Sequence, residues 1–216
     1  MDQNDILKAL EKLKAESKKR KFKQRIDFII NLKNLDLKKS ENQVDFYLQL
    51  PHSVGRKKSI CALVGPELAE EAKVCDEVVQ MDDFQKFQQD KAGLKNLAER
   101  HDYFIAQANI MPKVAQVFGR VLGPRGKMPN PKAGCVVPPK ANLSLLYERL
   151  QNTQRVAAKT QPLVQTAIGH EEMDDKDVAE NALNIYDQLV HHLPLEKNNI
   201  RSVYIKMTMS GSQKLE

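Results

Sequence analysis

Ser59-Ile60-Cys61-Ala62-Leu63-Val64-Gly65 is a run that is continuously apolar from position 60 to position 64. A strand that is apolar on both sides needs cover on both faces, which is typical of the interior of a parallel sheet. Downstream, short apolar runs alternate with helical stretches. Further strands are predicted near 78–79 and 103–108, and helices over 66–74, 82–88, 91–99, 111–121 and 142–150. This alternation predicts a Rossmann-like α/β domain over residues 55–155.

The sequence on either side of this block has a different period. Before it, a helix is expected over 4–16, followed by two strands in which apolar and polar residues alternate. Their inward positions are Ile26, Phe28, Ile30 and Leu32, and then Val44, Phe46, Leu48 and Leu50. After the block we expect a strand over 163–168, a helix over 174–191 and a strand over 202–209, the last with Val203, Ile205, Met207 and Met209 on one side. Alternation with period two is typical of antiparallel sheets that leave one face in water.

Neither end of the chain contains enough strands for a stable sheet by itself. We therefore expect the two ends to fold together and the middle block to be inserted between them. The predicted fold class is α/β (α+β) with two domains. One is a discontinuous split α/β sandwich domain built from both termini, residues 1–54 and 156–216, and the other is the inserted Rossmann-like domain. The two crossing segments, 51–55 and 152–156, would form a hinge.

Composition narrows the function classes. The 216 residues are 41% hydrophobic, and Lys and Arg exceed Asp and Glu by 34 − 28 = 6 charges. Tryptophan is absent and aromatic residues are only 6%, which argues against a carbohydrate cleft or an aromatic stacking sheet. The three cysteines, Cys61, Cys75 and Cys135, are predicted to be reduced buried thiols rather than disulfides or zinc ligands. No apolar run approaches the ~18–20 residues that cross a bilayer, so a cytoplasmic protein without a membrane partner is expected.

A basic segment follows the first predicted helix. Residues 17–25 hold six cations around one aromatic residue: Lys18, Lys19, Arg20, Lys21, Lys23 and Arg25, with Phe22 among them. Such a cluster suits phosphate neutralisation, and a partly exposed Phe22 could pack on a base or a ribose. Cations at a helix C-terminus also complement the helix dipole without binding anything. Both interpretations remain open from the residues alone.

A second basic segment lies in the middle block. Residues 122–134 hold three glycines, three prolines and the cations Arg125, Lys127 and Lys132. Proline and glycine exclude a regular helix or a central strand, so a stiff loop that points its cations outward is expected. The loop lacks the first glycine and the Ser/Thr of a nucleotide-binding P-loop. Gly123-Pro124-Arg125-Gly126 mimics the GxxG clamp of KH domains, but the proline-rich continuation disfavours that domain. Contact with RNA or transfer RNA and a purely structural role are about equally supported.

Several motifs together resemble the “L-one” family of large-subunit ribosomal proteins, and more closely its archaeal members. The match includes Leu122-Gly123-Pro124-Arg125-Gly126-Lys127-Met128-Pro129-Asn130-Pro131 in the loop, Arg20-Lys21-Phe22 before the first strand, Leu50-Pro51-His52 at the hinge, and Arg201-Ser202-Val203-Tyr204-Ile205-Lys206-Met207-Thr208-Met209 near the C-terminus. The motifs occur in the same order as in the family and cover essentially the whole chain.

The resemblance implies a non-enzymatic component of the large ribosomal subunit. It would bind large-subunit ribosomal RNA to form the mobile stalk at the tRNA exit site, contact exit-site tRNA, and repress translation by binding its own mRNA. In this family the RNA site combines an aromatic residue after the first helix with a Thr-Met-Gly triad, and these positions are matched by Phe22 and by Thr208, Met209 and Ser210, with Gly211 next. We expect the cations beside Phe22 (Lys21, Lys23 and Arg25) and Lys159, in the loop before the first returning strand, to border the same RNA-binding surface. Arg125, Lys127 and Lys132 are expected as secondary contacts to RNA or tRNA. Ser210 stands where the family usually has glycine, with Gly211 one place later.

Two other function classes were weighed. A Rossmann-type nucleotide-binding enzyme is disfavoured because Val64-Gly65 runs into Pro66-Glu67 instead of a GxGxxG turn. A free mRNA-binding translational regulator is not excluded by sequence. We expect no catalytic residue, no metal, no cofactor and a monomer when free. The acidic residues at 171–177 are expected to cap the long helix and to face away from RNA.

Overall fold

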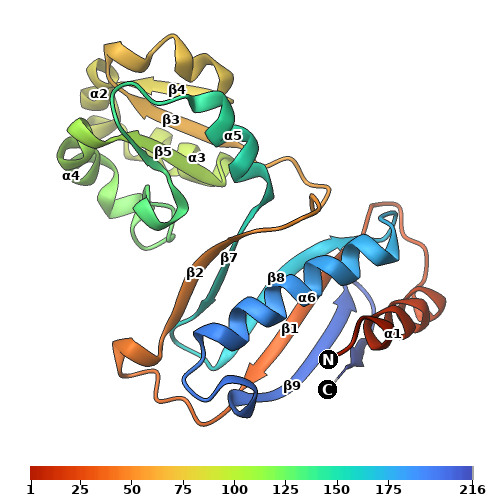
Figure 1. Cartoon of the computed structure of the whole chain (residues 1–216). Coiled ribbons are helices and arrows are strands. Elements are labelled where there is room, and N and C mark those ends of the chain that lie inside the picture. Colours follow the sequence, from red (N-terminus) through yellow and green to blue (C-terminus); the bar gives the residue numbers. More distant parts are fainter. Residues whose placement is uncertain (216) are drawn as a thin grey trace. The chain divides into compact units, whose positions relative to one another are not determined.

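The computed structural model describes residues 1–215, and it divides the chain into two compact units (Figure 1). Unit 1 comprises Met1–Arg56 together with the chain from Asn152 onward, and unit 2 comprises Lys57–Gln151. The expected boundary at 155/156 would have cut through a strand of unit 1, β7 (Thr153–Ala158). The whole of this strand belongs to unit 1 because it pairs with β2 (Val44–Gln49) in a two-stranded antiparallel ribbon.

Both termini of the chain contribute to the main sheet of unit 1. Its four antiparallel strands lie in the order β10 (Ser212–Lys214), β9 (Ile200–Met207), β1 (Arg25–Leu32) and β8 (Leu163–His170). The N-terminal strand β1 is hydrogen-bonded on both sides to C-terminal strands. This sheet cannot form until both ends of the chain are present.

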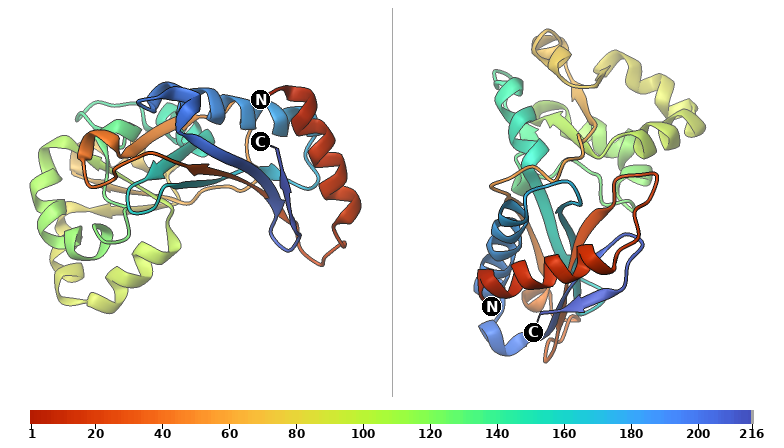
Figure 2. Two further views of the ribbon diagram at one scale, coloured as in Figure 1. Left: turned by 90° about the horizontal axis from the view of Figure 1, so that it is seen from below. Right: turned by 90° about the vertical axis from the view of Figure 1, so that its right-hand side faces the viewer.

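Two helices cover one face of this sheet, α1 (Gln3–Glu16) and α6 (Asp175–His192) (Figure 2). The alternation in β1 confirms the sequence-based prediction, because every second residue from Ile26 to Leu32 is buried. The same holds for β9 up to Met207, but Met209 is 59% exposed. Met209 was wrongly predicted to be on the inward face, because β9 ends at Met207 and the chain turns there into β10.

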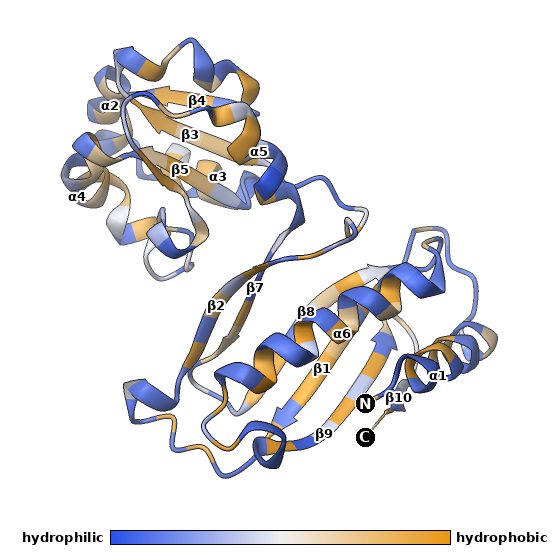
Figure 3. Cartoon of the chain, in the orientation of Figure 1, coloured by the Kyte–Doolittle hydropathy of each residue, from blue (hydrophilic) through white to orange (hydrophobic). Residues whose placement is uncertain are grey.

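Unit 2 has the parallel sheet that the sequence predicts. Its strand order is β4 (Glu77–Gln80), β3 (Ile60–Val64), β5 (Tyr103–Gln107) and β6 (Val136–Val137), and all neighbours are parallel. All five residues of β3 are buried. Figure 3 shows continuous hydrophobic colour along β3, in contrast to the mixed colours of β9.

The helices of unit 2 are α2 (Phe84–Gln89), α3 (Lys91–Arg100), α4 (Met111–Leu122) and α5 (Leu143–Asn152). The stretch 66–74, expected to be helical, contains two 3₁₀ turns, η2 (Pro66–Leu68) and η3 (Glu71–Val74). Only Leu68 and Ala72 are buried there, so little apolar surface is available to stabilise a longer α-helix. Short 3₁₀ turns also occur at 40–42, 81–83, 108–110, 131–133 and 196–199.

The segments that connect the units are held within each unit by amide side chains. In unit 1 the His52 backbone N–H donates to Asn181 Oδ1 and its carbonyl accepts from Asn181 Nδ2, both at 3.1 Å. In unit 2, Gln151 Oε1 accepts from the Lys58 N–H at 2.8 Å and its Nε2 donates to the Lys58 carbonyl at 2.9 Å. Asn181 and Gln151 therefore fix the backbone of this connecting segment at His52 and at Lys58.

Candidate nucleic-acid interface

The predicted RNA-binding residues of unit 1 meet at one end of its main sheet, where β1 begins and β9 ends. Ile26 pairs with Met207, and beyond this pair the Arg25 N–H donates to Thr208 Oγ1 at 3.2 Å. The Thr208 N–H donates in return to the Arg25 carbonyl at 3.1 Å. The end of the basic segment and the start of the β9–β10 turn, 183 positions apart in sequence, are therefore adjacent.

The side chain of Gln24 joins the basic segment to the β9–β10 turn. Its side chain is completely buried. Oε1 accepts from the Met209 N–H at 3.1 Å, while Nε2 donates to Ser17 Oγ, the Lys18 carbonyl and Glu171 Oε2 at 3.1–3.3 Å. A buried amide with all its partners rigidifies what it joins. Sequence reasoning missed Gln24, because nothing in the basic segment indicates that its one amide would face inward.

Two large apolar side chains are left in water beside the cations. Phe22 is 50% exposed and Met209 is 59% exposed, and Lys21 and Arg25 are also exposed. Most of the basic segment lies beyond the end of α1 at Glu16, and the dipole effect fades within the last turn of a helix. Dipole complementation therefore does not account for this cluster, whereas an exposed aromatic ring among cations suits nucleic acid.

The β9–β10 turn is closed by the serine that replaces the family glycine. Ser210 Oγ accepts from the Met207 N–H at 2.9 Å and donates to the Gly211 carbonyl at 2.8 Å. Neither residue 210 nor residue 211 has a positive φ, and a Cβ added at Gly211 would touch nothing. The backbone of this turn thus requires glycine at neither position.

The acidic residues before α6 do not face away from this surface, contrary to expectation. Lys23 Nζ forms an ion pair of 2.5 Å with Glu172, and Glu171 is bonded to Gln24. The hydrogen bond with Glu172 raises the pKa of Lys23, and the bond with Lys23 lowers the pKa of Glu172. The expected capping role is confirmed for Asp174, whose side chain accepts from the Lys176 N–H. Lys23 consequently offers less free charge than Lys21 or Arg25.

Lys159 lies at the opposite end of the sheet. The β8 residue nearest to it, Leu163, pairs with Asn31, whereas His170 at the other end of β8 pairs with Arg25. At about 3.3 Å per residue, these two ends are on the order of 25 Å apart. Lys159 Nζ contacts Asp45 Oδ2 at 2.7 Å, and Arg155 binds the same carboxylate at 2.9 Å. Burial raises the pKa of Asp45, but these two hydrogen bonds outweigh it and lower the pKa overall.

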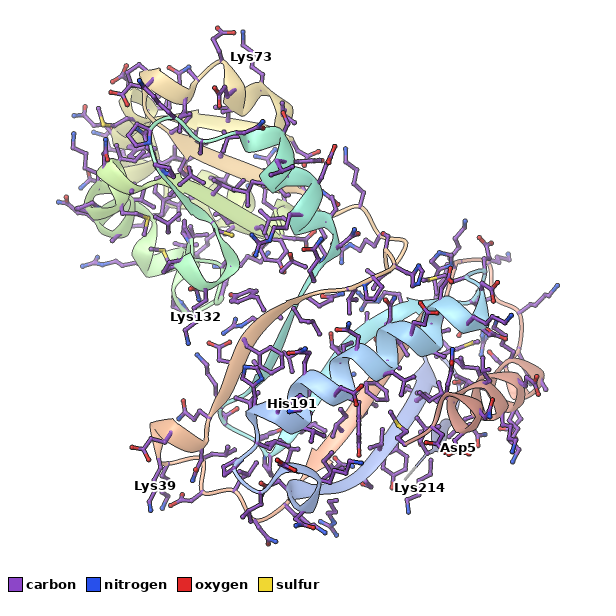
Figure 4. All side chains as sticks on the ribbon, viewed as in Figure 1. Asp5, Lys39, Lys73, Lys132, His191 and Lys214 are labelled. Atoms are coloured by element: carbon purple, nitrogen blue, oxygen red, sulfur yellow. The ribbon has the colours of Figure 1, made fainter. Side chains whose placement is uncertain are left out.

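The three cations of the loop in unit 2 have different environments, and only in part do they point outward as expected. Lys127 Nζ donates to the carbonyls of Ala98 and His101, both at 2.7 Å, at the end of α3. It thereby satisfies carbonyls that a helix terminus leaves without partners. Arg125 is paired with Glu99 at 2.9 Å. Lys132 is exposed, and Figure 4 shows its side chain projecting from the ribbon. Lys127 is a structural residue.

Unit 2 contains two arrangements that resemble enzyme sites. His101 is bonded to Ser59 Oγ and to Glu77 Oε2, both at 2.8 Å. This trio lies where β3, β4 and β5 begin, whereas open parallel sheets bind ligands at the carboxyl ends of their strands. At those carboxyl ends, Gln107 Oε1 accepts from the Gly65 N–H at 3.0 Å and Nε2 donates to Glu67 at 3.1 Å. The amide side chain of Gln107 therefore occupies the place that a phosphate would need.

The remaining expectations concern thiols, metals and membranes. All three cysteines are free and buried. Burial raises the pKa of Cys75 and of Cys135 to about 11 and also raises the pKa of Cys61, so these thiols stay protonated at neutral pH. Among residues 1–215 no group of metal-binding side chains occurs, and no helix of this part of the chain is long and apolar enough to cross a membrane.

Sequence reasoning also missed a pocket beside the exposed aromatic ring. It has a volume of about 410 Å³ and is lined by residues from four segments of unit 1, namely Phe22, Lys23, Arg25, Val54, Gly55, Arg56, His170 and Thr208. Residues 51–55 had been assigned only to the hinge. A glycine next to an arginine at the end of that segment was the one available signal.

Comparisons with known proteins show which family the chain belongs to. The model of the ribosomal protein L1p/L10e family matches residues 13–211. The large ribosomal subunit protein uL1 of Nanoarchaeum equitans is 45% identical over 199 residues, which cover 90% of this chain and 92% of that protein. The uL1 proteins of Thermococcus kodakarensis and Methanothermococcus thermolithotrophicus are 36% and 37% identical over all of this chain and 98% and 100% of theirs. These relatives are archaeal, as the sequence motifs indicated, and the family is one of ribosomal proteins and not of enzymes. The chain belongs to the ribosomal protein L1p/L10e family.

Proposed function

We propose that this protein is a structural constituent of the large ribosomal subunit and binds large-subunit ribosomal RNA through unit 1. The observation that carries the proposal is the set of hydrogen bonds around Gln24. These bonds fix the basic segment against the β9–β10 turn and leave Phe22 and Met209 exposed beside Lys21 and Arg25.

The chemistry of this surface suits folded RNA. Lys21 and Arg25 would neutralise phosphates and release counterions. The hydroxyl oxygens of Thr208 and Ser210 each keep an acceptor site to which a 2′-hydroxyl group of RNA can donate. The sheet face opposite the helices, with the half-buried cross-strand pairs Asp27–Lys206 and Ile29–Tyr204, leads from this end toward Lys159. An RNA helix lying over that face would reach both ends.

The names of the relatives support the ribosomal assignment, since each is called a large ribosomal subunit protein. The proposal includes a place for the protein in the mobile stalk at the tRNA exit site, on ribosomes of the cytoplasm. For unit 2 we propose a secondary contact with RNA or exit-site tRNA through Lys132 and Arg125. Lys127 is not part of this proposal, because its ammonium group is used within the fold.

A surface that reads RNA by shape would also bind a messenger RNA folded in the same way. Repression of its own translation is therefore a secondary proposal. The alternative of a free mRNA-binding regulator differs in one measurable respect, since such a protein would not sediment with large subunits.

The test is a filter-binding titration of the full chain with a stalk segment of large-subunit RNA, paired with co-sedimentation on large subunits. Phe22→Ala should weaken binding by about 1–3 kcal/mol, because the ring loses its contact with a base or ribose. His191→Ala, an exposed change at the far end of α6 (Figure 4), should leave binding unchanged. No affinity of the unaltered chain for the RNA, or no sedimentation with large subunits, would contradict the proposal.

A further inference from the structure

The pocket beside Phe22 is lined by a histidine with one defined hydrogen-bond donor. The Glu172 N–H donates to His170 Nδ1 at 3.2 Å. In a neutral imidazole only one nitrogen carries a hydrogen, so with Nδ1 accepting, the hydrogen is on Nε2. His170, whose hydrogen-bond donor is then Nε2–H, lines this pocket together with Phe22 and Arg25.

Gly55 sets the position of this ring. Its φ is +78°, and a Cβ at this position would overlap Cδ2 and Nε2 of His170. Glycine is therefore required at this position for two reasons: the backbone conformation favours glycine, and the imidazole of His170 leaves no room for a Cβ. The end of the segment leaving unit 1 and the end of β8 together form this wall of the pocket.

The pocket contains the three kinds of group that recognise a nucleotide. Phe22 offers a half-exposed ring to a base, Arg25 offers positive charge to a phosphate, and His170 offers a hydrogen-bond donor to a phosphate or base oxygen. Its volume of about 410 Å³ lies in the range of about 300–1,000 Å³ that is usual for small-ligand sites. A base that is paired in an RNA helix could not enter this pocket, because the strand that carries its pairing partner would have to enter with it.

We propose that the pocket between Phe22, Arg25, Gly55 and His170 holds a single unpaired nucleotide of the bound RNA. The inference rests on the proposed RNA-binding function and adds to it a subsite for one nucleotide that has left its helix. Phe22 packs against the base, and Arg25 and His170 Nε2 hold the phosphate and the polar edge.

The test uses two RNAs of equal length: a stalk segment of large-subunit RNA with its unpaired nucleotides, and the same segment with every such nucleotide paired. The full chain should bind the first RNA more tightly. His170→Phe, which keeps a ring but no donor, should lower that affinity about tenfold and leave affinity for the paired RNA unchanged. His170→Gln, which keeps a donor, should restore most of it, and His191→Phe is the matched control. Gly55→Ala should act like His170→Phe by displacing the imidazole.

A second readout needs only the unaltered chain. 2-Aminopurine placed in turn at each unpaired position should report one position whose fluorescence changes on binding. If the unaltered chain binds neither RNA, the proposed function itself fails. If it binds, but no position responds or the variants weaken both RNAs equally, the function stands and the nucleotide pocket is overturned.

Discussion

The basic segment of unit 1 and the basic loop of unit 2 both contain several cations in sequence, but these cations have different environments in the structure. Around Phe22, a buried amide supplies the internal hydrogen bonds, and the cations at positions 21 and 25 remain in water. In the loop, a cation supplies the internal hydrogen bonds, since Lys127 donates to two carbonyls at the end of α3. A count of positive residues therefore overstates the charge available to a polyanion, and the difference is decided by which polar group satisfies the backbone.

The largest expected effect comes from removing the buried Gln24 amide, which holds the basic segment in place. Gln24→Leu removes the hydrogen-bond partner of several polar groups, among them the Met209 N–H and the Lys18 carbonyl. We expect the free energy of unfolding of unit 1 to fall by roughly 2–4 kcal/mol and RNA affinity to fall with it. Urea denaturation and filter binding measure the two, with Gln188→Leu on the exposed face of α6 as control. Unchanged stability would show that Gln24 does not hold the surface together.

The second prediction compares the same substitution at Lys127 and at Lys21. Lys127→Met should lower the stability of unit 2 by roughly 1.5–3 kcal/mol, because two hydrogen bonds from a charged group are lost. Lys21→Met, at an exposed site, should change stability by less than about 0.5 kcal/mol. Hydrogen exchange at α3 amides would locate the first effect. The comparison between the segments breaks down if Lys127→Met weakens RNA binding and leaves stability intact.

The third prediction sharpens the comparison within the basic segment. Replacing Lys21 or Arg25 by glutamine should reduce the slope of log affinity against log salt by about 0.7–0.9, since in the proposed complex each contacts one phosphate. Lys23→Gln should reduce it less, because Lys23 is already paired with Glu172, and Lys127→Gln should not reduce it at all. Equal slopes for the Lys21 and Lys127 variants would mean that the loop cation also reaches phosphate.

The smallest effect is on pH dependence and concerns the segment that leaves unit 1. A hydrogen bond from His52 Nε2 to the Glu180 carboxylate, at 2.8 Å, raises the pKa of His52 above 6.5, and Asp177 adds to this effect. The stabilisation is fully present below the unfolded-state pKa and is lost as pH rises through the folded-state pKa. The stability of unit 1 should therefore decline slightly from pH 6 to pH 8 in the unaltered chain and less so in His52→Gln. Denaturation curves that decline equally in both proteins would remove His52 from this role.

Much of the fold could be predicted because it depends on local periodicity. The unbroken apolar run at 60–64 gave a parallel strand, and alternation from Ile26 to Leu32 gave an antiparallel one. The strand β7 was missed because Thr153-Gln154-Arg155 is polar, and it is ordered by pairing with β2. β10 was missed because a three-residue strand carries almost no periodic signal. Of the candidate site, Phe22 and Thr208 were predicted through the family motif, whereas His170 and Gly55 belong to no motif and meet only in space.

The sequence by itself determined the two kinds of sheet, the interruption of one domain by another, and the family. These depend on hydrophobic patterns and motifs that are read along the chain. Only the tertiary structure decided which cations face water, because Lys23, Lys127 and Arg125 find partners that are 149, 26 to 29, and 26 positions away. The energy of a charge depends on its neighbours in space and on its solvation. No local pattern specifies either of these.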